Sequence, residues 1–235
     1  EVKKFGSQVI VKDLPLQWPY AVACVVKGIK FNNEKIREVI QLQEKLGTTF
    51  TRNRKKGGLG LYPLEKINFP VTFTGKKPEE IRFRPLEFPQ IITGQQILSK
   101  HPKGREYGHL MEDWKTYPVF VDSKGVIMSM PPIINSHDVG KIDETTTNVF
   151  IEGTGPDLNT ITISLAILIT SLADMGGEIY SLEIISPQHK FDFPDLNPTK
   201  MKLDLNYINK RLGLKLQEKE AKELLERMGY GYENS

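Results

Sequence analysis

The chain contains a single cysteine, and this scarcity excludes a disulfide framework. Cys24 is the one residue among 235 that could form a disulfide or bind a metal through a thiolate. It lies in the apolar run AVACVV, residues 21–26, where a free cysteine usually packs as a small core side chain. We therefore expect a reduced core thiol and a cytoplasmic protein.

Long apolar runs and several catalytic signatures are also missing. The longest apolar stretch is interrupted by Thr and Ser and is too short to cross a bilayer, and no signal peptide is visible, so we predict no membrane residence. There is no Ser-His-Asp pattern and no phosphate-binding glycine loop followed by lysine. His109 and His137 lack ligand spacing to another His or Cys, and Asp143 and Glu144 lack the further carboxylates of a metal site. A net charge of +3 permits a nucleic-acid partner without indicating one.

What is present is an α+β pattern of interleaved helix and strand signals. Asn33 is predicted to cap a helix over residues 34–46, with Ile36, Val39, Ile40 and Leu46 on one face and Gly47 as its end. Asp157 or Asn159 is predicted to open a second helix, ITISLAILITSLADM, whose apolar character on nearly every face predicts a buried central helix. The strand GEIYSLEII follows it.

The proline-rich segment 186–198 is the candidate linker between domains. Beyond it, residues 201–205 alternate like a short strand, residues 207–212 suggest a short helix, and residues 217–228 form an amphipathic helix pattern. These residues resemble half of a winged-helix-like module.

The central segment, residues 104–155, places function-like residues where short strands end. Residues 117–122 and 126–130 are apolar runs joined by Ser-Lys-Gly, which indicates a hairpin with Gly125 at the turn. The second run leads through two prolines to Asn135. A third run, residues 148–152, ends in Glu152 followed by Gly-Thr-Gly, where glycines allow a ligand to approach the backbone.

Three motifs of this segment carry a resemblance to a known family. GREYGH, VDSKGVIMSMPPIINS and TTNVFIEGTG resemble the editing domain of the β subunits of archaeal and eukaryotic-type phenylalanyl-tRNA synthetases. The likeness covers roughly residues 20 to 190, and residues 201–233 resemble the start of the next domain of that subunit. It implies mixed and antiparallel sheets with packed helices, an editing domain over 1–192, a linker over 193–200 and a truncated winged-helix-like domain over 201–235. Since residue 1 is not methionine, we expect an excised piece of a longer subunit.

The resemblance also implies a function. Post-transfer editing would hydrolyse mischarged tyrosyl-tRNA(Phe) in a polar pocket that recognises the tyrosine hydroxyl, with tRNA(Phe) and the α subunit of a heterotetramer (two α and two β subunits) as partners. ATP and magnesium would serve the whole ligase, with no cofactor in this region. An alternative is a noncatalytic tRNA-docking and subunit-assembly module, and a weaker one is a free-standing aminoacyl-tRNA hydrolase.

By family position, Glu152 would bind the phenolic hydroxyl, Ser129 the aminoacyl group, and Thr154 and Asn135 the attacking water and ester. Phe120 would form an aromatic wall. Relatives often have Asp and Leu in place of Glu152 and Phe120, which makes the pocket shape differ here. Each residue also has an ordinary interpretation: a surface carboxylate for Glu152, a packing serine, a turn-forming threonine and an Asx-turn asparagine.

Two groups of basic residues are candidates for contact with tRNA phosphates. The first is Arg52, Arg54, Lys55 and Lys56, in TRNRKKGG directly after the first predicted helix; an ordinary solvated loop is an equal alternative. The second is Lys103 and Arg105, expected at the mouth of the pocket, to guide the tRNA terminus.

Overall fold

The computed structural model describes residues 1–233 and divides the chain into two compact units, Glu1–Leu196 and a second unit that begins at Asn197. The division falls inside the segment predicted as a linker, 193–200. Most contacts of each unit lie within that unit. The predicted α+β class is confirmed.

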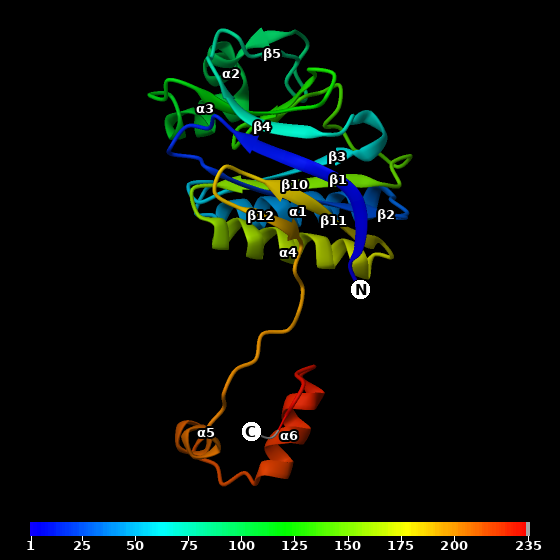
Figure 1. Cartoon of the computed structure of the whole chain (residues 1–235), viewed down its shortest axis with the longest axis vertical. Coiled ribbons are helices and arrows are strands. Elements are labelled where there is room, and N and C mark those ends of the chain that lie inside the picture. The colour runs from blue at the N-terminus through cyan, green and yellow to red at the C-terminus, as the bar shows by residue number, and fades with distance from the viewer. Residues whose placement is uncertain (234–235) are drawn as a thin grey trace. The chain divides into compact units, whose positions relative to one another are not determined.

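A large mixed sheet forms the first unit (Figure 1). Its strands run in the order β3-β10-β2-β11-β1-β4-β7-β8-β9, with β12 paired to β11. The strands of this sheet are β1 (Lys3–Lys12), β2 (Tyr20–Lys27), β3 (Gly58–Pro63), β4 (Val71–Lys76), β7 (Tyr117–Val121), β8 (Ile127–Met130), β9 (Ile134–Asn135), β10 (Val149–Gly155), β11 (Glu178–Ile185) and β12 (Lys190–Phe193). β1 lies parallel to β4 and β11, and the other pairs are antiparallel.

Two long helices, α1 (Asn33–Thr48) and α4 (Leu158–Asp174), cover one face of this sheet (Figure 1). Asp157 begins α4, as predicted, by accepting a hydrogen bond from the Thr160 N–H. Gly155 of β10 lets α4 approach closely, because a Cβ there would lie 3.0 Å from Ile161 Cγ2. The apolar residues of α4 therefore pack on β10 and β2.

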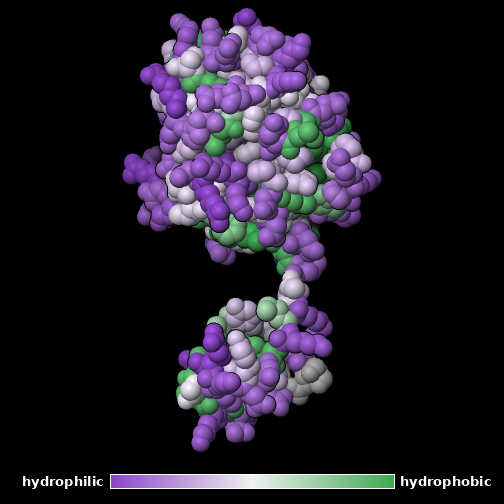
Figure 2. All heavy atoms as spheres, turned by 90° about the vertical axis from the view of Figure 1, so that its left-hand side faces the viewer, coloured by the Kyte–Doolittle hydropathy of each residue, from purple (hydrophilic) through white to green (hydrophobic). Residues whose placement is uncertain are grey.

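A smaller layer lies on the opposite side of the sheet (Figure 1). It consists of β5 (Arg82–Phe83), β6 (Ile92–Thr93), α2 (Gly94–Lys100), α3 (Pro102–Tyr107) and the 3-10 turn Gly108–Leu110. Another 3-10 turn, Leu64–Lys66, directly follows β3, and Leu64 packs against the core of the large sheet. A second hydrophobic core, which includes Ile81, Ile97, Met111 and Tyr117, joins the small strands and helices to β7 and β8. On the face in Figure 2 the surface is largely hydrophilic, with hydrophobic residues in small separate patches.

The second unit contains α5 (Leu205–Leu212) and α6 (Glu218–Arg227). Asp204 caps α5 by accepting from the Asn206 N–H, and Gly213 ends it in the left-handed conformation with φ 67°. Large apolar side chains of this unit remain exposed, among them Met201, Tyr207, Leu212 and Met228.

Several local predictions were wrong. Asn32, not Asn33, caps α1, because its side chain accepts from the Lys35 N–H, and α1 continues through Gly47 to Thr48. Ile40 is 43% exposed, so it lies outside the buried face.

Three further predictions fail because tertiary context overrides a local pattern. The helix α4 is a covering helix rather than a central one, since Ile163 and Ile167 are each 39% exposed. The linker predicted over residues 186–198 begins too early, because Lys190–Phe193 pairs with β11. The strand predicted over residues 201–205 is absent, since residues 201–204 have no pairing partner among residues 1–233 and Leu205 begins α5.

Candidate functional site

Glu152 and Thr154 lie together in the interior, on the face of β10 turned away from α4. Alternation along a strand puts residues two apart on the same side, so the prediction that they share a face is confirmed. The prediction that Glu152 ends its strand is wrong: β10 continues through Gly-Thr-Gly, which pairs with β2 and β3. Their exposed fractions are 1% and 0%, so both side chains are inside the domain.

Phe120, Ser129 and Asn135 form a row across three neighbouring strands. Phe120 pairs with Ser129, and Ser129 pairs with Asn135, so their side chains face the same way. The Phe120 ring stacks on Phe73 at 4.5 Å between centroids and meets the edge of Phe150 at 6.2 Å. Phe150 and Glu152 are two residues apart on β10 and so lie on the same face. The side chains of Phe120, Ser129 and Asn135 therefore line the same interior as the Glu152 carboxyl.

Tyr62 joins the two ends of the sheet. Its hydroxyl lies 3.1 Å from Glu152 Oε1 and 3.2 Å from Asn135 Oδ1, and Asn135 Nδ2 donates to the Leu61 carbonyl at 3.4 Å. Since β3 and β9 are the first and last strands of the order, these bonds close the curved sheet on itself. Glu152, predicted to bind the phenolic hydroxyl of the substrate (the hydroxyl reader), and Asn135, predicted to lie beside the ester, thereby belong to one hydrogen-bond network.

Burial governs the electrostatics of this network. It raises the pKa of Glu152 to about 8, against a smaller lowering by the Tyr62 hydrogen bond, and it raises the pKa of Tyr62, with the charge of Glu152 adding to the effect. The hydrogen bonds of Tyr62 also indicate a protonated Glu152. The Tyr62 hydroxyl has one proton but lies beside two acceptor oxygens, Asn135 Oδ1 and Glu152 Oε1. It can donate to Asn135 and accept from Glu152 if the Glu152 carboxyl carries a proton.

Three buried polar atoms of this site have no hydrogen-bond partner among residues 1–233: Ser129 Oγ, Glu152 Oε2 and Thr154 Oγ1. Leaving such a group unpaired costs about 1–3 kcal/mol. Among residues 1–233, only two other buried side-chain atoms lack a partner, Trp18 Nε1 and His137 Nδ1, so the unpartnered atoms concentrate in this interior.

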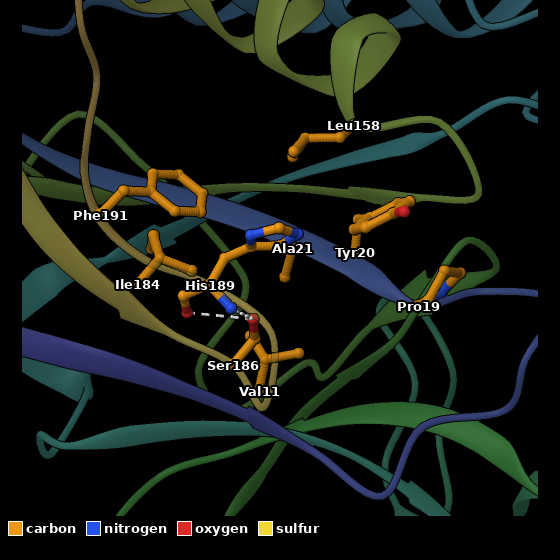
Figure 3. A pocket seen from close by; sticks show the side chains of 9 residues that line it. All are labelled: Val11, Pro19, Tyr20, Ala21, Leu158, Ile184, Ser186, His189 and Phe191. Carbon is orange, nitrogen blue, oxygen red and sulfur yellow. Dashed lines mark hydrogen bonds between the residues drawn. The ribbon is translucent and has the colours of Figure 1, made fainter.

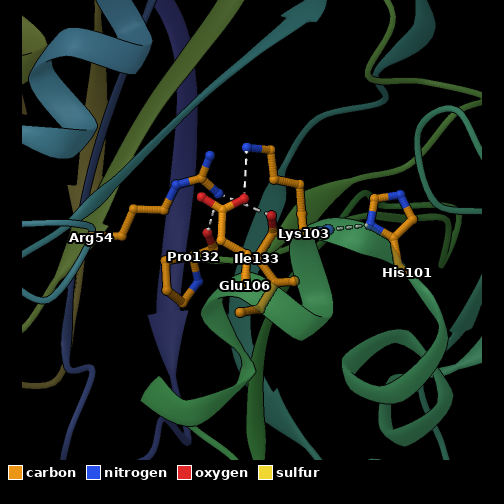
Figure 4. A network of polar contacts seen from close by, with 6 residues as sticks. All are labelled: Arg54, His101, Lys103, Glu106, Pro132 and Ile133. Carbon is orange, nitrogen blue, oxygen red and sulfur yellow. Dashed lines mark hydrogen bonds and ion pairs between the residues drawn. The ribbon is translucent and has the colours of Figure 1, made fainter.

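The basic loop after α1 turns one of its arginines inward. Arg52, Asn53 and Arg54 have φ values of 52°, 54° and 62°, a left-handed run that reverses the chain. Arg54 Nη1 donates to the carbonyl oxygens of Pro132 at 2.7 Å and Ile133 at 3.0 Å (Figure 4). Its guanidinium also lies 4.2 Å from the centroid of the Tyr107 ring. Arg54 thus ties the loop to the segment that carries Asn135.

Replacing Arg54 by alanine is expected to lower the free energy of unfolding by about 2 kcal/mol, because two carbonyls lose a charged donor and an aromatic ring loses its cation. Arg52→Ala is the matched control: Arg52 is exposed, and its removal is expected to change stability by less than about 0.5 kcal/mol. Urea unfolding of both variants measures this. Equal losses would contradict the inward role of Arg54.

The other predicted tRNA contacts occupy the surface. Arg52 and Lys55 are exposed, and Lys56 lies 3.8 Å from the Asp157 carboxylate. On α3, Lys103 pairs with Glu106 at 3.0 Å (Figure 4), and Arg105 donates to the Lys100 carbonyl.

Sequence reasoning missed His101, which lies beside these contacts. Its Nδ1 accepts a hydrogen bond from the Lys103 N–H and so caps the N-terminus of α3. Its Nε2 lies 3.0 Å from the Leu86 carbonyl oxygen.

Tyr62 was missed as well, although a signal existed. Gly58, Gly60 and Tyr62 alternate on one face of GLGLYP, and a strand face with two glycines leaves room for large side chains from the neighbouring strand. A Cβ on Gly60 would lie 2.3 Å from Glu152 Oε1 and 2.7 Å from the Tyr62 hydroxyl.

A shallow crevice elsewhere in the first unit is lined by apolar residues with Ser186 and His189 at its edge (Figure 3). It holds only about 10 Å³, too little for a substrate. Among residues 1–233, no three His, Cys, Asp or Glu side chains meet as a metal site. No helix in the same residues is long and apolar enough to cross a membrane.

Comparison with known proteins identifies the family. No family model matches the chain. The phenylalanine-tRNA ligase β subunit of Thermococcus kodakarensis is 42% identical over 215 residues, and that of Pyrococcus horikoshii is 40% identical over 239 residues. A crystal structure of an N-terminal fragment of the P. horikoshii subunit superposes with a TM-score of 0.95 at 40% identity, covering 100% of this chain and 68% of that one. The chain belongs to the phenylalanine-tRNA ligase β-subunit family.

The match extends over most of the chain but not over the whole of its relatives. It covers 92% of this chain and 37% of the T. kodakarensis ligase β subunit, and 100% of this chain and 42% of the P. horikoshii one. The chain therefore spans about two fifths of the ligase β subunits that it matches. The resemblance seen in its motifs is confirmed at the level of family and fold.

Proposed function

We propose that this region hydrolyses tyrosyl-tRNA(Phe) that the ligase has mischarged. The observation that carries the proposal is the buried Glu152 carboxyl, whose Oε2 has no partner and which shares its interior with the unpartnered hydroxyls of Ser129 and Thr154. The site offers a hydroxyl reader at one end and small polar groups beside it, as an aminoacyl ester with a phenol side chain requires.

The need for such a site follows from the limits of an apolar pocket. A synthetic site shaped for phenylalanine rejects an isostere with one added hydroxyl by only about 100-fold. A second site that hydrogen-bonds the hydroxyl discriminates far better, because its buried acceptor stays unpaired when phenylalanine enters. The buried Glu152 carboxyl supplies such an acceptor.

The chemistry assigned to the remaining residues is positioning. Water attacks the ester carbonyl, the bond to the ribose oxygen breaks, and that oxygen leaves with the proton released by the water. Thr154 and Asn135 hold the water, together with a tRNA hydroxyl, and Ser129 contacts the aminoacyl group. No covalent intermediate is required, since the reaction needs an oriented water and dipoles at the developing oxyanion.

The whole enzyme supplies what this region does not. We propose that the chain works with an α subunit in a heterotetramer and that tRNA(Phe) approaches over Arg52, Lys55, Lys56, Lys103 and Arg105. We propose that ATP and magnesium serve other parts of the ligase.

The test is single-turnover hydrolysis of tyrosyl-tRNA(Phe) and phenylalanyl-tRNA(Phe) by the assembled enzyme and by this chain alone. We expect the enzyme to release tyrosine at least about 100-fold faster than phenylalanine. Tyrosyl-tRNA that decays at the rate seen without enzyme would refute the proposal.

A noncatalytic tRNA-docking and assembly module is the second candidate, favoured by the filled interior. Tyr62 and Phe120 are both fully buried, and the Tyr62 phenol already lies against Glu152. This candidate predicts tRNA binding by the chain without any hydrolysis, and the same experiment separates the two.

A further inference from the structure

We propose that Tyr62 is a built-in substitute for the substrate side chain: its phenol occupies the hydroxyl reader in the free protein and leaves when a tyrosyl group binds. This deepens the proposed editing function and rests on it for the identity of the ligand.

The interior beside Glu152 has no space for a second aromatic ring. Exposed fractions are 0% for Tyr62 and Phe120 and 1% for Glu152 and Ser129. A gap of phenol size would leave these side chains accessible to water, so a side chain must move before a tyrosyl group enters. Tyr62 is the residue whose departure frees a space of that size and shape.

The hydrogen bonds support the same exchange. The substrate phenol would seek Glu152, and the chain's own phenol lies 3.1 Å from Glu152 Oε1. One phenol replacing another restores the hydrogen bond that is broken. Phenylalanine restores none, so the exchange itself favours tyrosine.

Removal of Tyr62 also frees the groups at the ester end. Its hydroxyl lies 3.2 Å from Asn135 Oδ1, and this contact spans the two ends of the sheet. Withdrawal of Tyr62 frees Asn135 Oδ1, whereas Asn135 Nδ2 keeps its hydrogen bond to the Leu61 carbonyl between β9 and β3. One movement therefore exposes both the hydroxyl reader and the amide that faces the ester.

The position of Tyr62 favours such a movement. It lies on β3, which pairs with β10 and with no second strand of the sheet, so fewer hydrogen bonds oppose its displacement. β3 begins at Gly58, next to the loop that carries Arg52, Lys55 and Lys56. A phosphate bound at this loop would act directly on the strand that carries Tyr62.

The first test uses p-cresol, which has the size and hydroxyl of a tyrosine side chain. In the whole chain, Tyr62→Ala leaves a phenol-shaped cavity beside Glu152. We expect p-cresol to raise the melting temperature of this variant by several degrees and to bind at least about tenfold more tightly than toluene. Tyr117→Ala removes a buried tyrosine from the second core, and there p-cresol should have no such advantage. Equal binding of p-cresol and toluene to Tyr62→Ala would overturn the proposal.

The second test covers the case in which Tyr62→Ala does not fold. Tyr62→Phe keeps the ring against Phe150 and removes only the competing hydroxyl. We expect an amide-linked tyrosyl-adenosine to bind this variant about fivefold to tenfold more tightly than it binds the wild type. Weaker or unchanged binding would show that the hydroxyl supports the site rather than occupying it.

These readouts separate the two proposals. Failed hydrolysis of tyrosyl-tRNA by the wild type removes the editing function, whereas p-cresol binding by Tyr62→Ala still decides whether Tyr62 fills a phenol site.

Discussion

Alanine in place of Glu152 is expected to lower hydrolysis of tyrosyl-tRNA(Phe) by the assembled enzyme at least about 100-fold, with little effect on the slow hydrolysis of phenylalanyl-tRNA(Phe). The reason is the position of the carboxyl: Glu152 is the buried acceptor that the substrate hydroxyl would use. Its loss removes an interaction that phenylalanine never makes, so selectivity disappears along with the rate.

Two further variants identify the cause of the loss. Glu152→Gln keeps one acceptor oxygen at nearly the same place, so an intermediate rate is expected. Glu79→Ala removes an exposed carboxylate with no partner in the interior and should leave the rate unchanged. If Glu152→Ala lowers the hydrolysis of both aminoacyl-tRNAs equally, Glu152 supports the fold and does not read the hydroxyl.

The stability of the chain is expected to fall as the pH rises from about 4.5 to about 8 through the contribution of Glu152. Burial raises the pKa of this carboxyl from 4.5 to about 8 in the folded chain. Within that window the folded state binds more protons than the unfolded state, so the free energy of unfolding decreases by up to about 1.4 kcal/mol for each pH unit. Above the folded pKa the loss is complete.

Urea unfolding of the wild type and Glu152→Gln at pH 5, 6, 7 and 8 measures this contribution. Other titrating groups cancel in the difference between the two proteins, and among residues 1–233 Tyr62 is the titratable side chain that acts on Glu152. The strand partners of Glu152, which are Ala23 and Gly60, carry no charge. The wild type should lose stability relative to the variant as the pH rises, and a constant difference would contradict a raised pKa.

Much of the site was predictable because it follows from alternation and pairing. A hairpin turn at Gly125 pairs β7 with β8, and period two along β10 puts Glu152 and Thr154 on one side. A register shift between Phe120 and Val121, which the turn does not predict, places Ser129 opposite Phe120. These are local rules. Assigning roles to those side chains needed the family resemblance, since a glutamate after an apolar run is otherwise an ordinary surface residue.

What the sequence did not reveal depends on long-range closure of the sheet. Tyr62 and Asn135 are 73 positions apart and meet because β3 and β9 end the strand order on facing sides. No local pattern contains that contact. Arg54 is similar: its basic neighbours predict an exposed loop, and three left-handed residues instead turn its guanidinium toward carbonyls 78 and 79 positions away.

The most direct test of the account is the relative affinity of the wild-type chain for amide-linked tyrosyl-adenosine and phenylalanyl-adenosine, measured by calorimetry. Neither compound is hydrolysed, so recognition is measured apart from chemistry. A buried acceptor that reads the hydroxyl predicts at least about tenfold tighter binding of the tyrosyl compound. Equal affinities would contradict the claim that Glu152 forms a tyrosine-reading site.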